Sequence, residues 1–334
     1  MLRKSEQQAV ESGQYRLAST AAGELTNLLR DAGHLEEALT MVERKKGHTR
    51  KAGLGPWTQL GDEVYRLQIL DAVGHHEEVL AAVEVRREEM KGLPESDDEN
   101  ETVEPWHVRE ALLSTGQLAS LALQRWQEAL SLNEEVIRAT VSRGATDLEV
   151  ARTRFNDYGP LLRLQRYGEA RRLLHQCLAV FESAGDTEDL GVVHSAIADL
   201  EYQLQHFQEA ARHEGTALRL KYSAPLPRTC AISHFNLANY LTRTNADARL
   251  ALAHRLASVL ISYQTNDGAL PRRSNALSSD LALVSPPASF DELCRLVEQT
   301  EGVRFRDLFS RLPQRAASGD EALRTVLEMA RAIV

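Results

Sequence analysis

The chain has 334 residues, with 48 acidic and 39 basic side chains, a net charge of −9 and 5% aromatic residues. An acidic balance without a long Lys/Arg block argues against nucleic-acid binding, and no stretch reaches the roughly 18 apolar residues of a membrane span. Three widely spaced cysteines and the lack of an apolar leader favour a cytoplasmic protein with reduced thiols.

The first expected element is a helix near the amino terminus. Residues 3–12 have the pattern of the second helix of a pair whose first helix is missing. Residues 1–14 are therefore interpreted as a possible remnant of a preceding repeat, which predicts that the chain is the carboxy-terminal part of a longer protein. The alternative is a genuine start at Met1, which is typical of a free-standing adaptor.

Between residues 15 and 262 a short phrase recurs. "LQRWQEAL", "LQRYGEAR" and "LQHFQEAA" begin at Leu123, Leu164 and Leu204, and "AGHLEEAL" and "VGHHEEVL" are weaker upstream copies. A small residue after the Glu marks equivalent positions at intervals of 41, 50, 41 and 40 residues: Ala38, Val79, Ala129, Ala170 and Ala210. A blurred sixth copy lies near Ala251. This period predicts an all-α solenoid of stacked helix pairs, in which each phrase is a turn.

The segment from Gly33 to Ala38 resembles the second-helix signature of tetratricopeptide repeats, and "HFNLANYL" from His234 resembles their first-helix signature. Because the period exceeds the usual value of about 34, the chain is similar to kinesin-light-chain-type arrays and to the arrays of large bacterial signalling ATPases and CHAT proteases. The resemblance implies a right-handed α-solenoid of about six helix pairs. It also implies a protein or peptide ligand and an effector enzyme, an ATPase or a protease, in cis or in trans.

The single interval of 50 residues contains an acidic insertion at residues 93–105. It carries six acidic residues and no basic one between Glu95 and Glu104, which predicts a solvated loop. Two interpretations stay open here. The loop is a tolerated insertion, or it reaches over the groove and repels acidic ligands.

Pro160 interrupts an otherwise helical pattern. It removes the helical hydrogen bond to the carbonyl of Asn156 and, with Gly159, predicts a bend in the helix. The bend either adjusts the curvature of the stack or leaves a backbone acceptor beside Asn156 and Asp157 facing the groove.

The first helices are expected to line the concave groove. Counting back from each turn predicts the groove-facing residues: Arg152, Phe155, Asn156, Asp157, Arg163, Asp199, Tyr202, Phe235, Asn236, Asn239 and Arg243. Asn156 and Asn236 occupy the same place in the repeat, and an amide side chain can both donate to and accept from a peptide backbone. The alternative for each of these residues is an ordinary solvated helix face.

The repeat pattern stops after residue 262. Residues 263–288 are expected to form a linker, and residues 289–334 a small helical cap with three helices near 289–300, 303–312 and 319–333. The pair Ser289 and Glu292 has the spacing of a capping box at the start of the first of these helices.

The sequence offers no pattern for catalysis. No His-Glu-x-x-His, Walker or Gly-x-Ser-x-Gly motif occurs, and the histidines and cysteines complete no four-ligand metal set. Neither a metal nor a cofactor is predicted, and Cys177 and Cys294 are expected to be buried thiols. The leading interpretation is an interaction module that binds a protein segment. A small-molecule sensor, a self-assembling scaffold and an unrecognised enzyme are the alternatives.

Overall fold

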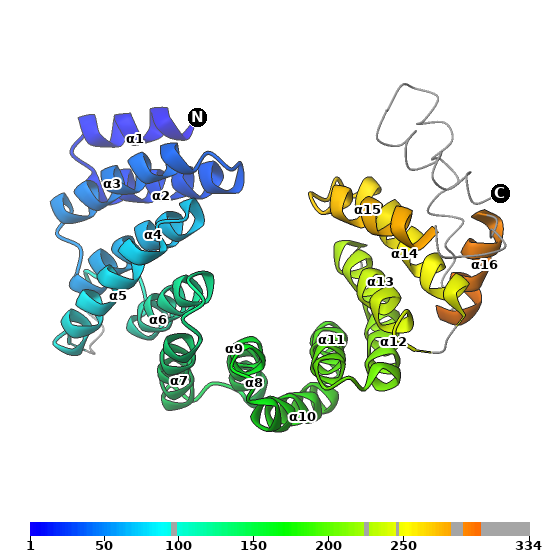
Figure 1. The fold of residues 1–334 in the computed structure, drawn as a ribbon. Helices are drawn as coiled ribbons and strands as arrows, with labels where there is room; N and C mark the ends of the chain where they lie inside the picture. Colours follow the sequence, from blue (N-terminus) through cyan, green and yellow to red (C-terminus); the bar gives the residue numbers. More distant parts are fainter. Residues whose placement is uncertain (95–98, 224–226, 245–246, 282–289, 302–334) are drawn as a thin grey trace. The chain divides into compact units, whose positions relative to one another are not determined.

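The computed structural model describes residues 1–94, 99–223, 227–244, 247–281 and 290–301. Within these ranges the chain forms helices joined by turns and short loops, without a strand. Within each unit, most successive helices pack side by side (Figure 1). The chain divides into two compact units, residues 1–166 and 167–334, which are described separately.

The first unit begins with a single helix followed by helix pairs. Its helices are α1 (Leu2–Glu11), α2 (Tyr15–Asp31), α3 (Leu35–Lys51), α4 (Pro56–Val73), α5 (His76–Lys91), α6 (Pro105–Ala122), α7 (Trp126–Ser142), α8 (Asp147–Phe155) and α9 (Tyr158–Arg163). Helix α1 packs against α2. The core of this unit contains the buried side chains of Trp57, Leu67 and Leu112.

The second unit continues the pairs and adds two further helices. Its helices are α10 (Tyr167–Ala184), α11 (Thr187–Gln203), α12 (Phe207–Ser223), α13 (Pro227–Leu241), α14 (Ala248–Gln264), α15 (Leu270–Leu281) and α16 (Phe290–Glu301). Its core includes Leu252, Leu256 and Leu260 of α14.

The expectation of a linker at residues 263–288 is wrong for its central part. Helix α15 occupies residues 270–281 and buries Arg273 and Leu277 against α14. The sequence did not indicate this helix, because most of its residues are polar and only a narrow stripe of it contacts the core. Helix α16 coincides with the first expected helix of the cap and also packs on α14, whereas the other two expected helices lie outside the described residues.

The repeated phrase forms the turn between the two helices of a pair. In each strong copy the Gln adopts a left-handed conformation, with φ of 59° at Gln124, 56° at Gln165 and 64° at Gln205. At Gln124 the backbone N–H donates to the Leu121 carbonyl at 3.1 Å, and the next N–H donates to Ser120 at 2.8 Å. This is the Schellman arrangement, which satisfies the last carbonyls of the helix.

The small residue of each phrase is buried where the second helix of the pair meets its neighbours. Ala38, Val79, Ala129, Ala170 and Ala210 are all fully buried. A side chain of this size allows two helices to approach closely. The phrase therefore has a packing role, as its position in the repeat predicts.

The acidic insertion is partly built into the fold of the first unit. Glu101 accepts hydrogen bonds from the backbone N–H groups of Trp57 at 2.9 Å and Thr58 at 2.7 Å. These are among the first N–H groups of α4, which have no partner within the helix. The N-cap residue is Gly55, which has no side chain to cap the helix, so the insertion supplies the cap. Glu101 therefore fits neither interpretation of the insertion: it is not a solvated loop residue, and it does not reach over the groove.

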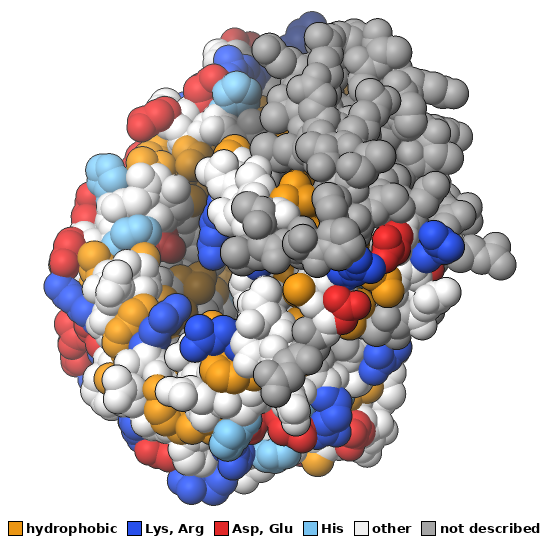
Figure 2. All heavy atoms as spheres, turned by 45° about the vertical axis from the view of Figure 1, so that its right-hand side comes forward, with side chains coloured by type: hydrophobic (Ala, Val, Ile, Leu, Met, Phe, Trp, Pro, Cys, Tyr) orange, Lys and Arg blue, Asp and Glu red, His pale blue; other side chains and the backbone are white. Residues whose placement is uncertain are grey.

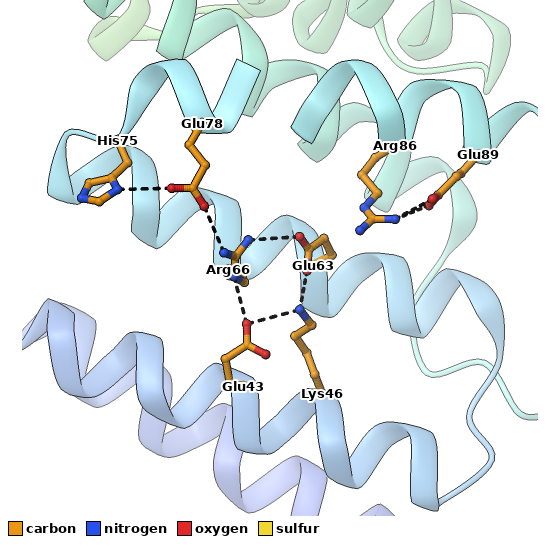
Figure 3. Close-up of polar contacts among 8 residues, drawn as sticks. All are labelled: Glu43, Lys46, Glu63, Arg66, His75, Glu78, Arg86 and Glu89. Atoms are coloured by element: carbon orange, nitrogen blue, oxygen red, sulfur yellow. Dashed lines mark hydrogen bonds and ion pairs between the residues drawn. The ribbon is translucent and has the colours of Figure 1, made fainter. Parts of the chain in front are cut away.

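Ion pairs connect three successive helices of the first unit (Figure 3). Arg66 of α4 contacts Glu43 of α3 at 2.9 Å and Glu78 of α5 at 3.2 Å. Lys46 of α3 donates to Glu63 of α4 at 2.5 Å. Although burial raises the pKa of Glu63, the bond and charge of Lys46 and the charge of Arg66 hold that pKa below its usual value. These charges neutralise one another and fix neighbouring helices in register.

Candidate functional site

A pocket of about 420 Å³ opens beside helix α6 in the first unit. We call it the α6–α9 pocket, and its lining comes from α6, the start of α7 and the junction of α8 with α9: Ser114, Gln117, Leu118, Leu121, Trp126, Phe155, Asn156, Tyr158, Gly159, Pro160 and Arg163. Helix α6 is the first helix of its pair, and α8 with α9 takes the place of the next first helix. The pocket therefore lies between first helices, where the repeat pattern places ligand-binding residues.

The break at Pro160 shapes one wall of the pocket. The backbone N–H of Asn156 donates to Thr153 at 3.3 Å and that of Asp157 donates to Arg154 at 3.0 Å, so the helix tightens before α9 begins. Regular bonding resumes with Leu161, which donates to Asp157 at 3.0 Å. Because Pro160 has no N–H, the carbonyl of Asn156 has no amide donor one turn later. The predicted interruption is thus present, and it divides the helix in two.

Aromatic and aliphatic side chains form the apolar part of the pocket. The rings of Phe155 and Tyr158 lie 4.9 Å apart, and Trp126 contributes to the same lining. Leu118 of α6 is 56% exposed. An additional Cβ at Gly159 would meet no atom within 4 Å, so this position borders open space. The pocket can therefore accept an apolar side chain.

Gln117 gives the pocket an unsatisfied polar group. The residue is only 3% exposed, yet its Nε2 has no hydrogen-bond partner in the described part of the chain. A buried amide donor without a partner costs about 1–3 kcal/mol. Because this nitrogen is itself enclosed, a peptide carbonyl would remove the cost only when the side chain turns its amide toward the pocket.

Two predicted groove residues, Asn156 and Arg163, border the pocket with exposed polar groups. Neither side chain makes a hydrogen bond or ion pair within the described ranges. Arg152 is also exposed, one turn before Asn156, but it does not line the pocket.

On the face shown in Figure 2, acidic and basic side chains are interspersed among hydrophobic ones.

Asp157 does not line the pocket, contrary to its predicted groove position. Asn133 of α7 donates from Nδ2 to its carboxylate at 2.8 Å and to the Thr153 carbonyl at 2.9 Å. Burial raises the pKa of Asp157 to about 6, against the lowering effect of the Asn133 bond. The Asp157 carboxylate therefore faces α7, the second helix of the preceding pair, and the Asn133 amide connects α7 to the end of α8.

In the second unit, Tyr202 and Arg243 take part in aromatic packing. The ring of Tyr202 lies 4.9 Å from that of Tyr240 and 5.5 Å from that of Phe207. The guanidinium of Arg243 lies 5.2 Å from the centre of the Phe207 ring. Tyr202 is half-buried and belongs to a small core cluster, so it departs from the open groove position expected from the sequence.

Phe235 and Asn239 are held by Arg255 of α14. Its guanidinium lies 4.5 Å from the centre of the Phe235 ring and donates to Oδ1 of Asn239 at 2.8 Å. Asn239 thus has a structural partner in place of a ligand. Asn236 and Asp199 are half-buried, and Asn236 makes no side-chain hydrogen bond within the described part of the unit. The matched register of Asn156 and Asn236 stays a prediction about ligand binding.

A buried polar cluster in the second unit contains a Ser–Lys contact. Lys221 donates to Ser195 at 2.6 Å and to Ser233 at 2.8 Å, and Ser195 donates to Glu214 at 2.9 Å. Burial lowers the pKa of Lys221 and raises that of Glu214, and each charge opposes the shift of the other group. Glu214 is completely buried and Lys221 nearly so. Ser195 is partly exposed, whereas the lysine and the glutamate beside it are enclosed, and these contacts support a packing role for the cluster.

Histidines and cysteines of the second unit are also placed for packing. His194 faces His213 with 3.0 Å between their Nδ1 atoms, and His234 faces His254 at 2.8 Å. No group of three or more His, Cys, Asp or Glu in the described ranges is placed to hold a metal ion. Cys177, Cys230 and Cys294 are buried and form no disulfide within the described ranges, and burial raises the pKa of the Cys230 thiol to about 11.

The sequence pattern missed several pocket residues. Gln117 and Leu118 lie on the first helix of the preceding pair, and Trp126 was assigned only to the turn. The signal that could have identified Leu118 is an apolar residue outside the buried stripe of α6, which contains Leu112, Leu113 and Ala119. No local pattern predicts that Gln117 would be buried without a partner.

None of the helices in the described ranges combines the length and apolar character needed to cross a membrane. No protein-family model and no curated protein matches the sequence. Among solved structures, the crystal structure of the apo form of RapI is similar, with a TM-score of 0.54 and 10% sequence identity, over 98% of this chain and 84% of that chain. At this identity the likeness concerns the fold. Together with the helix pairs, it shows that the chain is an all-α helical-repeat solenoid.

Proposed function

We propose that this chain is a protein-interaction module that binds an extended peptide segment of a partner in the α6–α9 pocket. The observation that carries the proposal is the buried Gln117 amide, which has no partner in the described ranges and lines an apolar pocket. A peptide backbone offers carbonyl acceptors at regular spacing, and the site needs such an acceptor.

The side chains around Gln117 define the peptide that fits. Leu118, Trp126 and Phe155 favour an apolar or aromatic residue of the ligand. Arg163 presents a guanidinium that suits a carboxylate, and the Asn156 amide can pair with the peptide backbone. The proposed ligand is therefore an extended segment with an apolar side chain next to an acidic group.

Binding in this pocket would be relayed to an effector in the cytoplasm. The buried cysteines, which form no disulfide in the described ranges, favour a reducing compartment. The proposed effector is an ATPase or a protease, in cis or in trans, and its support is the resemblance of the repeats to arrays found with such enzymes.

The test selects peptides from a random displayed library with the intact chain and measures their affinity by fluorescence polarisation. We expect enrichment of an apolar residue followed by an acidic one. Leu118→Glu should raise the Kd of the selected peptide by about tenfold or more, as expected for a central apolar contact. Arg163→Ala should weaken peptides that carry the acidic residue and spare those in which it is replaced by Gln.

Leu28→Glu is the matched control. Leu28 is 58% exposed on α2, another first helix of the same unit, and is outside the pocket. Circular dichroism would show that both variants keep their helices. Equal loss of affinity in the two variants, or a library without an enriched motif, would contradict the proposal.

A small-molecule sensor is the second candidate function, because three aromatic residues line the pocket. Its volume of about 420 Å³ is also within the size of small-ligand sites, roughly 300–1,000 Å³. Gly159→Leu should fill the open space and block either ligand. A metabolite that raises the Tm of the wild type but not of Gly159→Leu, with no enriched peptide, would favour the sensor.

A further inference from the structure

A second cavity lies at another place in the first unit. It has a volume of about 810 Å³ and is formed by the end of α5, the start of α6 and the second half of α7. It shares no lining residue with the α6–α9 pocket. Any ligand bound there would leave the first pocket open.

The lining of this cavity reverses the overall charge of the chain. Among the described residues, two acidic side chains line it, Glu104 and Glu135, and five basic ones: Arg87, Lys91, Arg109, Arg138 and Arg143. The whole chain carries a net charge of −9, so the basic lining is a local feature. Nearby cations with low-dielectric walls concentrate an anionic ligand.

Two of these cations keep their charge available for a ligand. Arg138 is exposed, and its described hydrogen bond goes to the backbone carbonyl of Glu134 in its own helix at 3.4 Å. Lys91 is 66% exposed and contacts only Glu88, one turn earlier, at 2.6 Å in the described part. Such an exposed pair is weak because water screens it, so a ligand carboxylate can replace it.

The other basic groups form the fixed wall. Arg143 donates to Glu110 at 2.7 Å and to Glu149 at 2.9 Å. Its guanidinium also lies 4.3 Å from the centre of the Trp106 ring, which stacks against His107 at 5.5 Å. Trp106 is the only aromatic residue in the lining, and with these contacts it offers no pair of faces to hold a nucleotide base.

The floor of the cavity is aliphatic. Met90 and Leu113 are buried beneath the basic rim, and Pro105 and Ala139 complete the lining. Apolar atoms in the floor suit the methylene groups of a peptide, whereas a free phosphate would gain nothing from them. We propose that this cavity binds an acidic peptide segment of a partner protein, with Lys91 and Arg138 pairing with its carboxylates.

The experiment uses the intact chain and a fluorescein-labelled peptide of sequence Glu-Leu-Glu-Glu-Leu-Glu. Binding should be measurable at low salt and should weaken as the ionic strength rises. The double variant Lys91→Glu, Arg138→Glu should raise the Kd by about tenfold or more, and Lys91→Gln, Arg138→Gln should lie between. The matched peptide Gln-Leu-Gln-Gln-Leu-Gln should not bind.

Charge-matched controls separate this site from general electrostatics and from the α6–α9 pocket. Lys4→Glu, Arg16→Glu makes the same change of net charge at two exposed positions outside the cavity and should leave the Kd within about twofold. Arg163→Ala should also leave it unchanged, so the two sites can fail independently. Equal loss in both double variants would overturn the inference. Direct binding of tripolyphosphate, measured by calorimetry, without any binding of the peptide would also overturn it, because the cavity would then be a phosphate site.

Discussion

The carboxylate of Glu101 accepts a hydrogen bond of 2.9 Å from the backbone N–H of Trp57, which precedes it by 44 residues. Helix α4 begins after Gly55, a residue without a capping side chain, and the acidic insertion provides the missing acceptor. Helix N-termini favour negative charge as well as hydrogen-bond acceptors. One residue of an apparently dispensable acidic loop thus belongs to the fold of the preceding repeat.

Replacing Glu101 by Ala should lower the free energy of unfolding of the first unit by about 1–2 kcal/mol. The cost arises because the N–H groups of Trp57 and Thr58 lose their acceptor at the start of α4. Urea denaturation followed by circular dichroism measures the change. Glu99→Ala is the control, because Glu99 is exposed in the same insertion, and it should change stability by less than about 0.5 kcal/mol.

The same contact couples Gly55 to Glu101. A Cβ at this position would displace the Glu101 carboxylate from the start of α4. Gly55→Ala should therefore destabilise the wild type more than it destabilises Glu101→Ala. Additive effects of the two substitutions would show that the residues do not interact.

The turns predict a stabilising substitution. Gln124 has φ of 59°, in the left-handed region that costs a residue with a Cβ about 1–2 kcal/mol. Glycine adopts this region without that cost, and the weaker copies of the phrase already have Gly33 and Gly74 there. Gln124→Gly should raise the urea midpoint, with a gain of about 0.5–1 kcal/mol.

Gln127→Gly is the control, and it should change the stability in the opposite direction to Gln124→Gly. Gln127 lies in helix α7, where glycine is disfavoured by up to about 1 kcal/mol. If Gln124→Gly destabilised the protein as Gln127→Gly does, the glutamine side chain would have a role beyond its backbone conformation. The same gain is expected at Gln165 and Gln205.

The repeat could be predicted from the sequence because its signal is local and recurs. Ala38, Ala129 and Ala210 are buried as their register requires, and the phrases form turns. The left-handed conformation of the glutamines could also have been predicted, because glycine occupies the same position in the weaker copies. Helix α15 was missed because its polar residues resemble a linker, and its core contact depends on α14.

The site was harder to predict than the fold. Counting along the repeat places Phe155, Asn156 and Arg163 at the pocket. It cannot identify partners distant in sequence, such as Asn133 for Asp157 or Arg255 for Asn239. A period fixes which face of a helix a residue occupies, but long-range contacts decide whether its polar group stays available.

Asp157→Asn should stabilise the first unit at neutral pH. The pKa of Asp157 is raised to about 6, chiefly by burial, against an ordinary value of 3.8. The folded state therefore binds a proton more readily than the unfolded state, and the Asp157 contribution to stability falls as the pH rises from about 4 to about 6. Above that range the charged carboxylate costs about 3 kcal/mol at most, because solvent screens part of the shift, and Asn removes this cost while it still accepts from Asn133.

Urea midpoints of wild type and variant between pH 4 and 8 would test this prediction. The difference should be largest above pH 6 and smallest near pH 4. Asp147→Asn is the control, because Asp147 is exposed in the first turn of α8 and interacts favourably with the helix dipole, so its loss should be slightly destabilising. A pH-independent difference between Asp157→Asn and wild type would contradict the prediction.

The buried histidine pair should make the second unit sensitive to acid. Burial lowers the pKa of His254 to about 3 and lowers that of His234 well below its usual value. The pair is closed by the Tyr222 hydroxyl, which lies 2.7 Å from Nε2 of His234. Below pH 6.5 the unfolded chain takes up protons that the folded chain does not, so the free energy of unfolding falls between about pH 6.5 and pH 3.

At pH 5 the loss from His254 alone is about 2 kcal/mol relative to pH 7. Glu214 acts in the opposite direction, because burial raises its pKa and protonation relieves that cost as the pH falls. The decisive quantity is therefore the difference in the free energy of unfolding between wild type and His254→Asn. The introduced amide can still pair with His234. This difference should shift in favour of the variant by about 2 kcal/mol between pH 7 and pH 5. The exposed His175→Asn variant of α10 should follow the wild type, and identical pH profiles for both variants would show that protonation of His254 does not limit stability.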